Sequence, residues 1–336
     1  MIEWLNLPPD TKRQILNEAA TRTGLRSNAI EKDWWVTLTL VACFQTVYKD
    51  HLVFKGGTSL SKAWGLVDRF SEDIDLVMNR EVLGFTGELS NTQIKKLREK
   101  TAVFVAITFR DALDGSLQAM GISQEWYQLG IQAGGVADRD PQVLELYYPS
   151  VLEPDGYLKD KVILEIGTRS LLEPADIRRV QSIIGQTFPD APFSDQPFPI
   201  LTVNPKRTFL EKVFLLHEEF LKAPEKRKHE RMSRHLYDVE KLMDTEFGVA
   251  ALQDRELYML IVSHRAKYTA IRGLDYNGHE PRTLNFVPPE DFHDIWARDY
   301  RQMQQSMIYG SSLPFAALIE RLIVLRERFR AVDMPF

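Results

Sequence analysis

The chain has 336 residues, of which 44% are hydrophobic and 26% are charged, and its net charge is −5. This composition is typical of a globular protein large enough for two subdomains, and the net charge disfavours a general nucleic-acid binder. The chain has no membrane-length apolar run, no signal-peptide pattern at its start and one cysteine, Cys43, which excludes an internal disulfide. We therefore expect a cytoplasmic protein that does not enter a membrane.

Two helices are predicted at the start of the chain. The first covers residues 10–23 and ends at Gly24, and the second begins near Ser27. The second helix carries Trp34 and Trp35, which we predict to be core residues and not a platform for stacking bases.

A glycine pair follows a short apolar approach at residues 51–54. Gly56 and Gly57 let the backbone come close to a ligand, and the helix-like run after them would offer free N–H groups to a phosphate. Thr58 and Ser59 add hydroxyl donors. The stretch predicts a phosphate-binding turn, although it lacks the Gly-Lys-Ser/Thr ending of a Walker A loop. By itself, an ordinary Gly-Gly turn is the alternative.

Two aspartates follow on a predicted strand at residues 73–77. The strand alternates with period two, so Asp73 and Asp75 project to the same face. Neighbouring carboxylates repel each other, and a divalent cation such as Mg²⁺ relieves that repulsion. An acidic pair at an exposed strand end is the alternative. Because the glycine turn and the acidic pair lie close together in the chain, we predict a site for a metal-bound nucleotide.

The middle of the chain predicts a sheet preceded by a long helix. The helix covers residues 92–120, and β-branched and aromatic residues predict strands at 126–132, 143–148, 161–166 and 198–203. Residues 173–197, rich in proline, are predicted to be a connector. The fold class is therefore α+β (mixed α/β), with a mixed sheet.

Glu165 is a single carboxylate within an apolar predicted strand. Burying such a group is costly unless it is paired. Glu165 could face water, pair with Arg169 or take part in a site.

The last third of the chain is predicted to be helical. We place the boundary at Asn204, which gives domains 1–204 and 205–336. A helix is predicted to start at Thr208, where Glu211 three residues later would complete a capping box.

Charged residues mark two of the helices in this last third. Lys212 lies on a mostly apolar stripe, where it could extend to solvent or point into a site. A later helix starting at Ser233 places Arg234 and Asp238 on neighbouring positions of one face. Positive residues gather between 206 and 235 and could face a polyanion, with a solvated linker as the alternative.

Four short motifs together resemble the nucleotidyltransferase toxins of the AbiEii/AbiGii family, within the DNA polymerase β-like superfamily. The most specific is Gly-Gly-Thr-Ser-Leu-Ser-Lys at 56–62 followed by Phe-Ser-Glu-Asp-Ile-Asp-Leu at 70–76. The others are Glu-Lys-Asp-Trp-Trp-Val at 31–36, Glu-Lys at 211–212 and Tyr-Asp-Val at 237–239. His235 stands where many members have aspartate, and it is an optional proton acceptor. Lys32 and Asp33 could support the site from the helix behind it.

The resemblance implies a sheet-bearing nucleotidyltransferase lobe and a helical lobe that closes the active-site cleft. An acceptor hydroxyl would attack the α-phosphate of an NTP and release pyrophosphate. Asp73 and Asp75 would hold Mg²⁺ (or Mn²⁺). Glu165 is the candidate for the third acidic residue of the superfamily, as a metal ligand or a base.

The resemblance also implies roles for four further residues. Lys212 would neutralise phosphate charge, and Asp238 would orient or deprotonate the acceptor hydroxyl. Lys62 and Arg234 are additional candidates for phosphate binding.

The expected biological role is that of the toxin in a toxin–antitoxin or phage-defence system. RNA, with tRNA as the leading candidate, is the expected acceptor, and a cognate antitoxin protein is a possible partner. Transfer to a protein or a small molecule is the second hypothesis, because the same metal site would serve. A non-catalytic nucleotide-binding module is the third.

Overall fold

The computed structural model describes residues 1–132, 140–153 and 159–332. The chain forms two compact units. Unit 1 contains Met1–Ala63 and Phe70–Thr202, and unit 2 contains Trp64–Arg69 and Val203–Phe336. The six residues Trp64–Arg69, called the crossing segment below, therefore pack with the second unit although unit 1 precedes and follows them in sequence.

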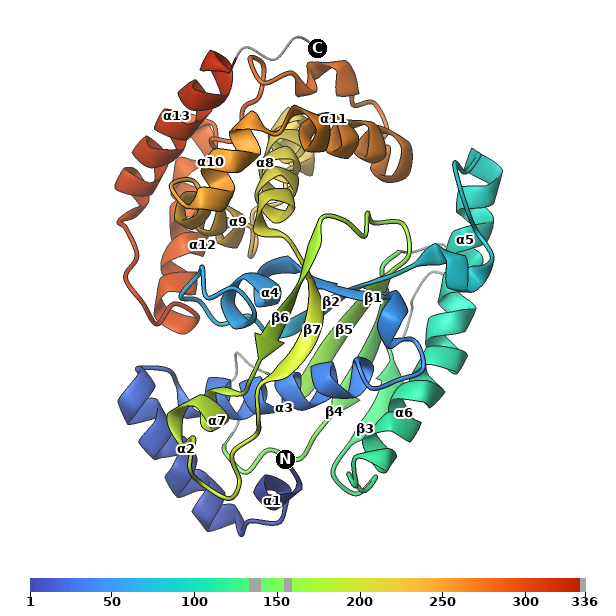
Figure 1. Ribbon diagram of the computed structural model, residues 1–336. Coiled ribbons are helices and arrows are strands. Elements are labelled where there is room, and N and C mark those ends of the chain that lie inside the picture. The colour runs from blue at the N-terminus through green and yellow to red at the C-terminus, as the bar shows by residue number, and fades with distance from the viewer. Residues whose placement is uncertain (133–139, 154–158, 333–336) are drawn as a thin grey trace. The chain divides into compact units, whose positions relative to one another are not determined.

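Unit 1 is built on one seven-stranded mixed sheet with the order β3–β4–β5–β2–β1–β7–β6 (Figure 1). The central strand β2 is parallel to β5 and antiparallel to β1. The strand bounds are β1 Leu52–Lys55, β2 Asp73–Met78, β3 Gln128–Ile131, β4 Gln142–Tyr147, β5 Lys161–Gly167, β6 Ala175–Val180 and β7 Phe198–Val203.

The helices of unit 1 are mostly amphipathic or buried. Their bounds are α1 Ile2–Leu5, α2 Pro9–Thr23, α3 Ser27–Cys43, α4 Gly56–Lys62, α5 Asn91–Val103, α6 Arg110–Ala119 and α7 Ile183–Thr187. A π-helical turn, Phe104–Phe109, joins α5 to α6. Helix α3 contacts β2, β5, α6 and α7 and is buried along almost its whole length. It is therefore the core helix against which the central strands pack.

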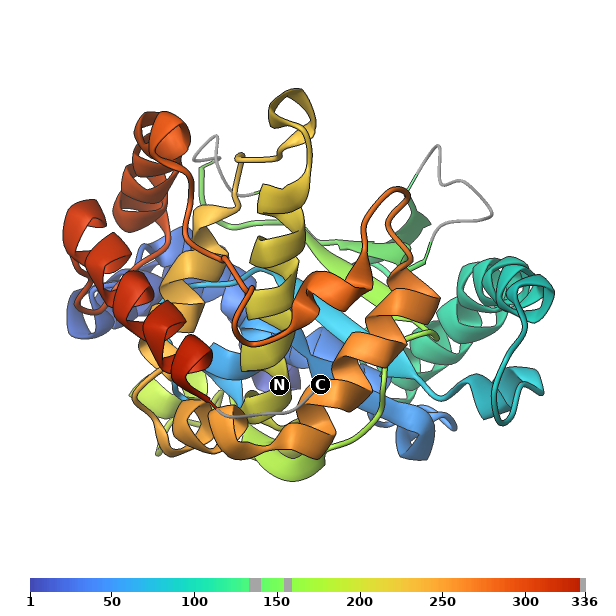
Figure 2. The ribbon, with the colours of Figure 1, turned by 90° about the horizontal axis from the view of Figure 1, so that it is seen from above.

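Unit 2 is helical. Its helices are α8 Pro205–Leu221, α9 Ser233–Leu242, α10 Glu246–Gln253, α11 Arg255–His264, α12 His293–Ser306 and α13 Phe315–Ala331. Helix α8, drawn in yellow in Figure 2, contacts α9, α10 and α11 and buries most of its side chains. The crossing segment joins this unit through a bridge between Arg69 and Ile308 and a hydrogen bond from Trp64 Nε1 to Val203 O.

The predicted fold class is confirmed: a mixed sheet is followed by a helical region. The predicted strand at 198–203 is β7, and Gly24 ends α2 in the left-handed region with a φ of 75°. Trp34 and Trp35 are buried core residues, as predicted. None of the described helices is both long and apolar enough to span a membrane.

Two predicted features of the fold are wrong. Residues 173–197 contain an edge strand, β6, whose side chains are mostly exposed and polar, so the sequence lacks the apolar alternation of a strand. Helix α8 begins at Pro205 and not at Thr208, because the side chain of Asn204 accepts a hydrogen bond from Lys206 N at 3.0 Å and proline suits the first helical position.

Candidate active site

The acidic pair lies at the start of β2, the central strand of the unit 1 sheet. Asp73 and Asp75 are both half-buried, whereas Ile74 and Leu76 on the opposite face are fully buried. The predicted strand is confirmed, and its period of two places both carboxylates on the same face. Asp75 makes no ion pair or hydrogen bond through its side chain with any residue that the structure describes.

Gly56 lies directly against Asp75. Its φ is 79°, in the region that favours glycine, and a Cβ on this residue would lie 2.7 Å from Asp75 Cγ. Lys55 precedes Gly56 at the end of β1 and pairs in register with Asp75 on β2. Glycine is therefore required here for two independent reasons, and the carboxylate of Asp75 and the first turn of α4 form one surface.

The hydroxyl groups after the glycine pair have internal partners. Thr58 Oγ1 donates to Asp73 O at 2.5 Å, and Ser59 Oγ donates to Gly56 O at 2.9 Å. Both side chains are buried. The predicted use of these hydroxyls as phosphate donors stays a prediction, and each hydroxyl already has an internal acceptor. They fix the turn to β2, and main-chain N–H groups at Gly57 and beyond remain the predicted phosphate donors.

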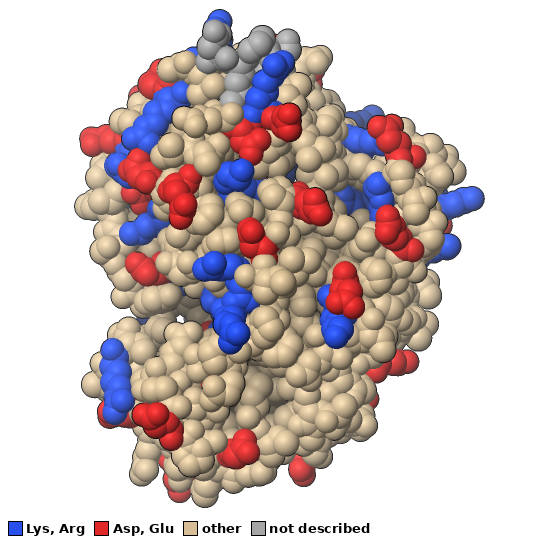
Figure 3. Space-filling model, in the orientation of Figure 1, with Lys and Arg blue, Asp and Glu red and all other residues tan. Residues whose placement is uncertain are grey.

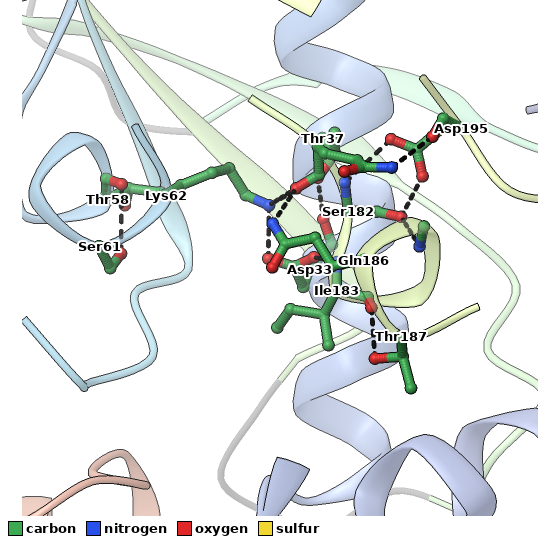
Figure 4. A network of polar contacts seen from close by, with 12 residues as sticks. Asp33, Thr37, Thr58, Ser61, Lys62, Ser182, Ile183, Gln186, Thr187 and Asp195 are labelled. Atoms are coloured by element: carbon green, nitrogen blue, oxygen red, sulfur yellow. Dashed lines mark hydrogen bonds and ion pairs between the residues drawn. The ribbon is translucent and has the colours of Figure 1, made fainter. Parts of the chain in front are cut away.

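Lys62 points into the interior of unit 1. Its Nζ lies 2.6 Å from Asp33 Oδ1 and donates to Thr37 Oγ1 at 2.7 Å and to Gln181 O at 3.2 Å (Figure 4). Its side chain is only 5% exposed. The ammonium group of Lys62 thus contacts α3 and the segment before α7, which argues against the predicted phosphate contact without testing it.

Glu165 lies beside the acidic pair on the adjacent parallel strand. It is the register partner of Asp75, and it is half-buried. Within the described ranges, however, no three or more His, Cys, Asp or Glu residues form a group that could hold a metal ion. Glu165 is thus a neighbour of the carboxylate pair in register, and its predicted part in the site stays a prediction.

Lys212 and Asp238, which the sequence analysis singled out separately, contact each other inside unit 2. Lys212 Nζ lies 2.9 Å from Asp238 Oδ2, and Asp238 is fully buried. Arg69 of the crossing segment completes the group, since its Nε and Nη2 donate to the two oxygens of Asp238 at 2.6 and 2.7 Å. Burial opposes ionisation of Asp238, but the charges of Arg69 and Lys212 outweigh it and hold the pKa of this carboxyl well below its usual range.

His235 and Arg234 border this buried ion cluster. His235 Nδ1 lies 3.4 Å from Lys212 Nζ. Burial, together with the charges of Lys212 and Arg234, lowers the pKa of His235 well below its ordinary value. His235 is therefore neutral at pH 7, and its Nδ1 accepts from the lysine. The predicted phosphate contact of Arg234 stays a prediction.

Arg69 is the functional candidate that sequence analysis missed. It is 1% exposed and separated by 169 positions from the carboxylate that it binds. The sequence shows that Arg69 lies between the glycine turn and the aspartate strand, but no pattern in the sequence indicates its contact with Asp238.

A family model for the nucleotidyl transferase AbiEii toxin of type IV toxin–antitoxin systems matches residues 39–330. The chain belongs to this AbiEii family. The predicted resemblance is confirmed, and so is the enzyme class: the protein is a nucleotidyltransferase of a family of toxins from type IV toxin–antitoxin systems. The matched range includes the glycine turn, the acidic pair and the unit 2 ion cluster.

Two solved structures from Helicobacter pylori are similar to this AbiEii member over most of their length. The crystal structure of JHP933 has a TM-score of 0.45 and 13% identity, covering 91% of this chain and 93% of that chain. The crystal structure of a proposed nucleotidyltransferase has a TM-score of 0.44 and 14% identity, covering 91% of this chain and 96% of that chain. No curated protein matches the sequence.

The residues at the start of β2 fit a hard divalent cation. Mg²⁺ prefers carboxylate oxygens, water and phosphate oxygens, and it is commonly held by one or two carboxylates beside a nucleotide. Asp73 and Asp75 provide two such carboxylates on one face, and Gly56 leaves the backbone beside them without a side chain.

Proposed function

We propose that this AbiEii-family enzyme transfers a nucleoside monophosphate from an NTP to a hydroxyl group of RNA in a Mg²⁺-dependent reaction. The observation that carries the proposal is the close approach of Gly56 to Asp75 on a strand face that also presents Asp73. In such a site the two carboxylates would hold Mg²⁺ (or Mn²⁺), which when bound neutralises charge on the reacting phosphate oxygens.

The reaction is an in-line displacement at the α-phosphorus. The acceptor oxygen forms a bond to phosphorus, the bond from phosphorus to the bridging oxygen of the β-phosphate breaks, and pyrophosphate leaves with that electron pair. We assign the β- and γ-phosphates to the main-chain N–H groups that begin α4. The acceptor proton needs a base, and we assign it to Glu165, which is half-buried and in register with Asp75.

Asp238 is less suited to be the base than the sequence suggested. A general base must reach the proton that it removes, and Asp238 is fully buried with both oxygens bound to cations. Its lowered pKa also makes it a weak proton acceptor.

RNA as the acceptor is supported by the charge distribution between α8 and α9. Residues 222–231 contain five cations and two carboxylates, and Lys226, Lys228 and Arg231 are exposed. Lys222 forms an ion pair with Glu219. On the face shown in Figure 3, the described positive and negative side chains are mixed. The positive charge that favours RNA binding is therefore that of residues 222–231 and not of this whole face.

The test combines the purified protein with Mg²⁺, each α-labelled NTP in turn and total cellular RNA, with the products separated on a denaturing gel. Label at tRNA size that is absent in Asp73→Asn supports the proposal, and label that declines steeply as salt rises supports electrostatic RNA binding. Label on a protein or small molecule instead would replace RNA as the acceptor. Label that persists in Asp73→Asn would contradict the metal site.

A further inference from the structure

The chain leaves unit 1 between the two halves of the proposed nucleotide site. Helix α4 ends at Lys62, residues 64–69 belong to unit 2, and the chain returns at Phe70 shortly before Asp73. Within unit 1, the hydrogen bond from Thr58 to Asp73 O joins the first turn of α4 to β2, and further contacts hold the end of α4 and the segment before β2. Two adjacent residues of α3 make such contacts.

Lys32 binds the segment that leads into β2. Its Nζ lies 2.5 Å from Glu72 Oε2, and Glu72 immediately precedes Asp73. The side chains of Lys32 and Glu72 are 1% and 8% exposed. The ammonium group also donates to Lys159 O at 3.1 Å, so it is held from two sides.

Asp33 binds the end of α4. One of its oxygens contacts Lys62 Nζ at 2.6 Å, and the other accepts from Ile183 N at 2.7 Å (Figure 4). Thr37, one turn further along α3, accepts a second bond from Lys62 and donates to Asp33 O. Neighbouring residues on a helix project in different directions, so Lys32 and Asp33 can engage different segments from one turn of α3.

We propose that Lys32 and Asp33 form a clamp that positions the glycine turn relative to Asp73 and Asp75, and that both are positioning residues of the nucleotide site. The effect of the clamp on nucleotide binding rests on the proposed function, whereas the clamp itself is argued from contacts within unit 1. Replacing a buried ion pair by apolar groups is often neutral for stability, so two such pairs side by side are better explained by geometry than by stability. Opposite charges on adjacent residues also fix which segment each one binds, because exchanging the partners would bring like charges together.

The clamp is tested with Asp33→Asn, Lys62→Met and the matched control Asp195→Asn. Asp195 is a similarly buried carboxylate in the same network, but it binds Ser182 at the start of α7 and makes no bond to α4 (Figure 4). The first readout is hydrogen exchange of the amides of residues 56–62, which needs no ligand. We expect faster exchange there in Asp33→Asn and Lys62→Met, and wild-type exchange in Asp195→Asn.

The second readout is affinity for Mn²⁺ alone, followed by its paramagnetic signal. Both clamp variants should bind Mn²⁺ about tenfold more weakly or worse, as is typical of lost outer-shell support, with Asp195→Asn within about twofold of wild type. A purely electrostatic effect would instead give opposite signs, because Asp33→Asn removes a negative charge and Lys62→Met removes a positive one. Opposite signs, or equal effects in the control, would overturn the clamp.

The two proposals fail in different ways. Wild-type protein that binds no Mn²⁺ would contradict the proposed metal site, and the exchange of residues 56–62 would still decide whether the clamp holds α4. Unchanged exchange in both clamp variants would overturn the clamp even if metal binding and transfer were demonstrated.

Discussion

The acidic pair of unit 1 and the aspartate of unit 2 are carboxylates in opposite environments. Asp73 and Asp75 are half-buried neighbours on one strand face, whereas Asp238 is fully buried and bound by Arg69 and Lys212. A carboxylate that binds a metal must keep oxygens available to it, and one whose oxygens are bound by two cations cannot. The difference teaches that carboxylates from one set of family motifs can lie in unlike environments, and it is the basis for our proposal that those of unit 1 bind metal while Asp238 stabilises unit 2.

The largest expected effect is the loss of activity in Asp75→Asn. Removing one of two metal-binding carboxylates should lower the rate of nucleotidyl transfer by about 10³-fold, because bound metal contributes several kcal/mol to the transition state. The melting temperature should stay the same or rise, since the substitution relieves repulsion between Asp73 and Asp75. Transfer rates and thermal melts of the same preparation check both parts. A large drop in melting temperature would mean that Asp75 has a structural role instead.

The next effect is on stability, in Asp238→Asn. This change leaves Arg69 and Lys212 as buried cations without their carboxylate, and the free energy of unfolding should fall by about 3–5 kcal/mol. Chemical denaturation measures it. Asp244→Asn is the control, since Asp244 also binds two arginines but is 48% exposed, and its loss should cost less than about 1 kcal/mol. Equal losses in the two variants would contradict the assignment of Asp238.

A smaller effect separates backbone strain from contact with the site. Gly56→Ala and Gly65→Ala both place alanine at a positive φ, 79° and 62°. The backbone strain should cost about 1–2 kcal/mol of stability in each variant, and Gly56→Ala should cost more because its Cβ also meets Asp75. Only Gly56 has Asp75 against it, whereas a Cβ on Gly65 would meet open space. Transfer activity should therefore fall at least tenfold, about 1.4 kcal/mol, in Gly56→Ala alone. Similar activity in both variants would show that Asp75 can move away from the turn.

The smallest effect is a pH dependence of stability from His235. Its pKa is lowered in the folded protein, so the unfolded chain takes up a proton near pH 6.5 while the folded chain does not. Stability from this group is present above pH 6.5 and is lost as pH falls below it. In His235→Asn the slope should decrease by up to about 1.4 kcal/mol per pH unit in that range. An unchanged slope between pH 6.5 and 5 would indicate that His235 is protonated in the folded state.

Local pattern predicted the placement of the acidic pair and the glycine turn better than the contacts that support them. The period of two placed Asp73 and Asp75 on one face, and the glycine pair predicted a close backbone approach. The direction of Lys62 was not predictable, because whether a lysine at a helix end points to a ligand or to the core depends on the partner packed beside it. That partner, Asp33, lies 29 positions earlier on α3.

Unit 2 was predictable only in part for the same reason. Helical spacing brought Lys212 and Asp238 to notice, and the structure pairs them. The contact of Asp238 with Arg69 joins residues 169 positions apart, so no local pattern reports it. The edge strand β6 was missed because its exposed side chains carry no apolar alternation.

The most direct test of this account is a Mn²⁺ titration of the wild type, Asp75→Asn and Asp238→Asn, each at a temperature where it is folded. We predict one class of Mn²⁺ site in the wild type, loss of that site in Asp75→Asn and its retention in Asp238→Asn. Retained binding in Asp75→Asn together with loss in folded Asp238→Asn would contradict the division of roles between the two carboxylate groups.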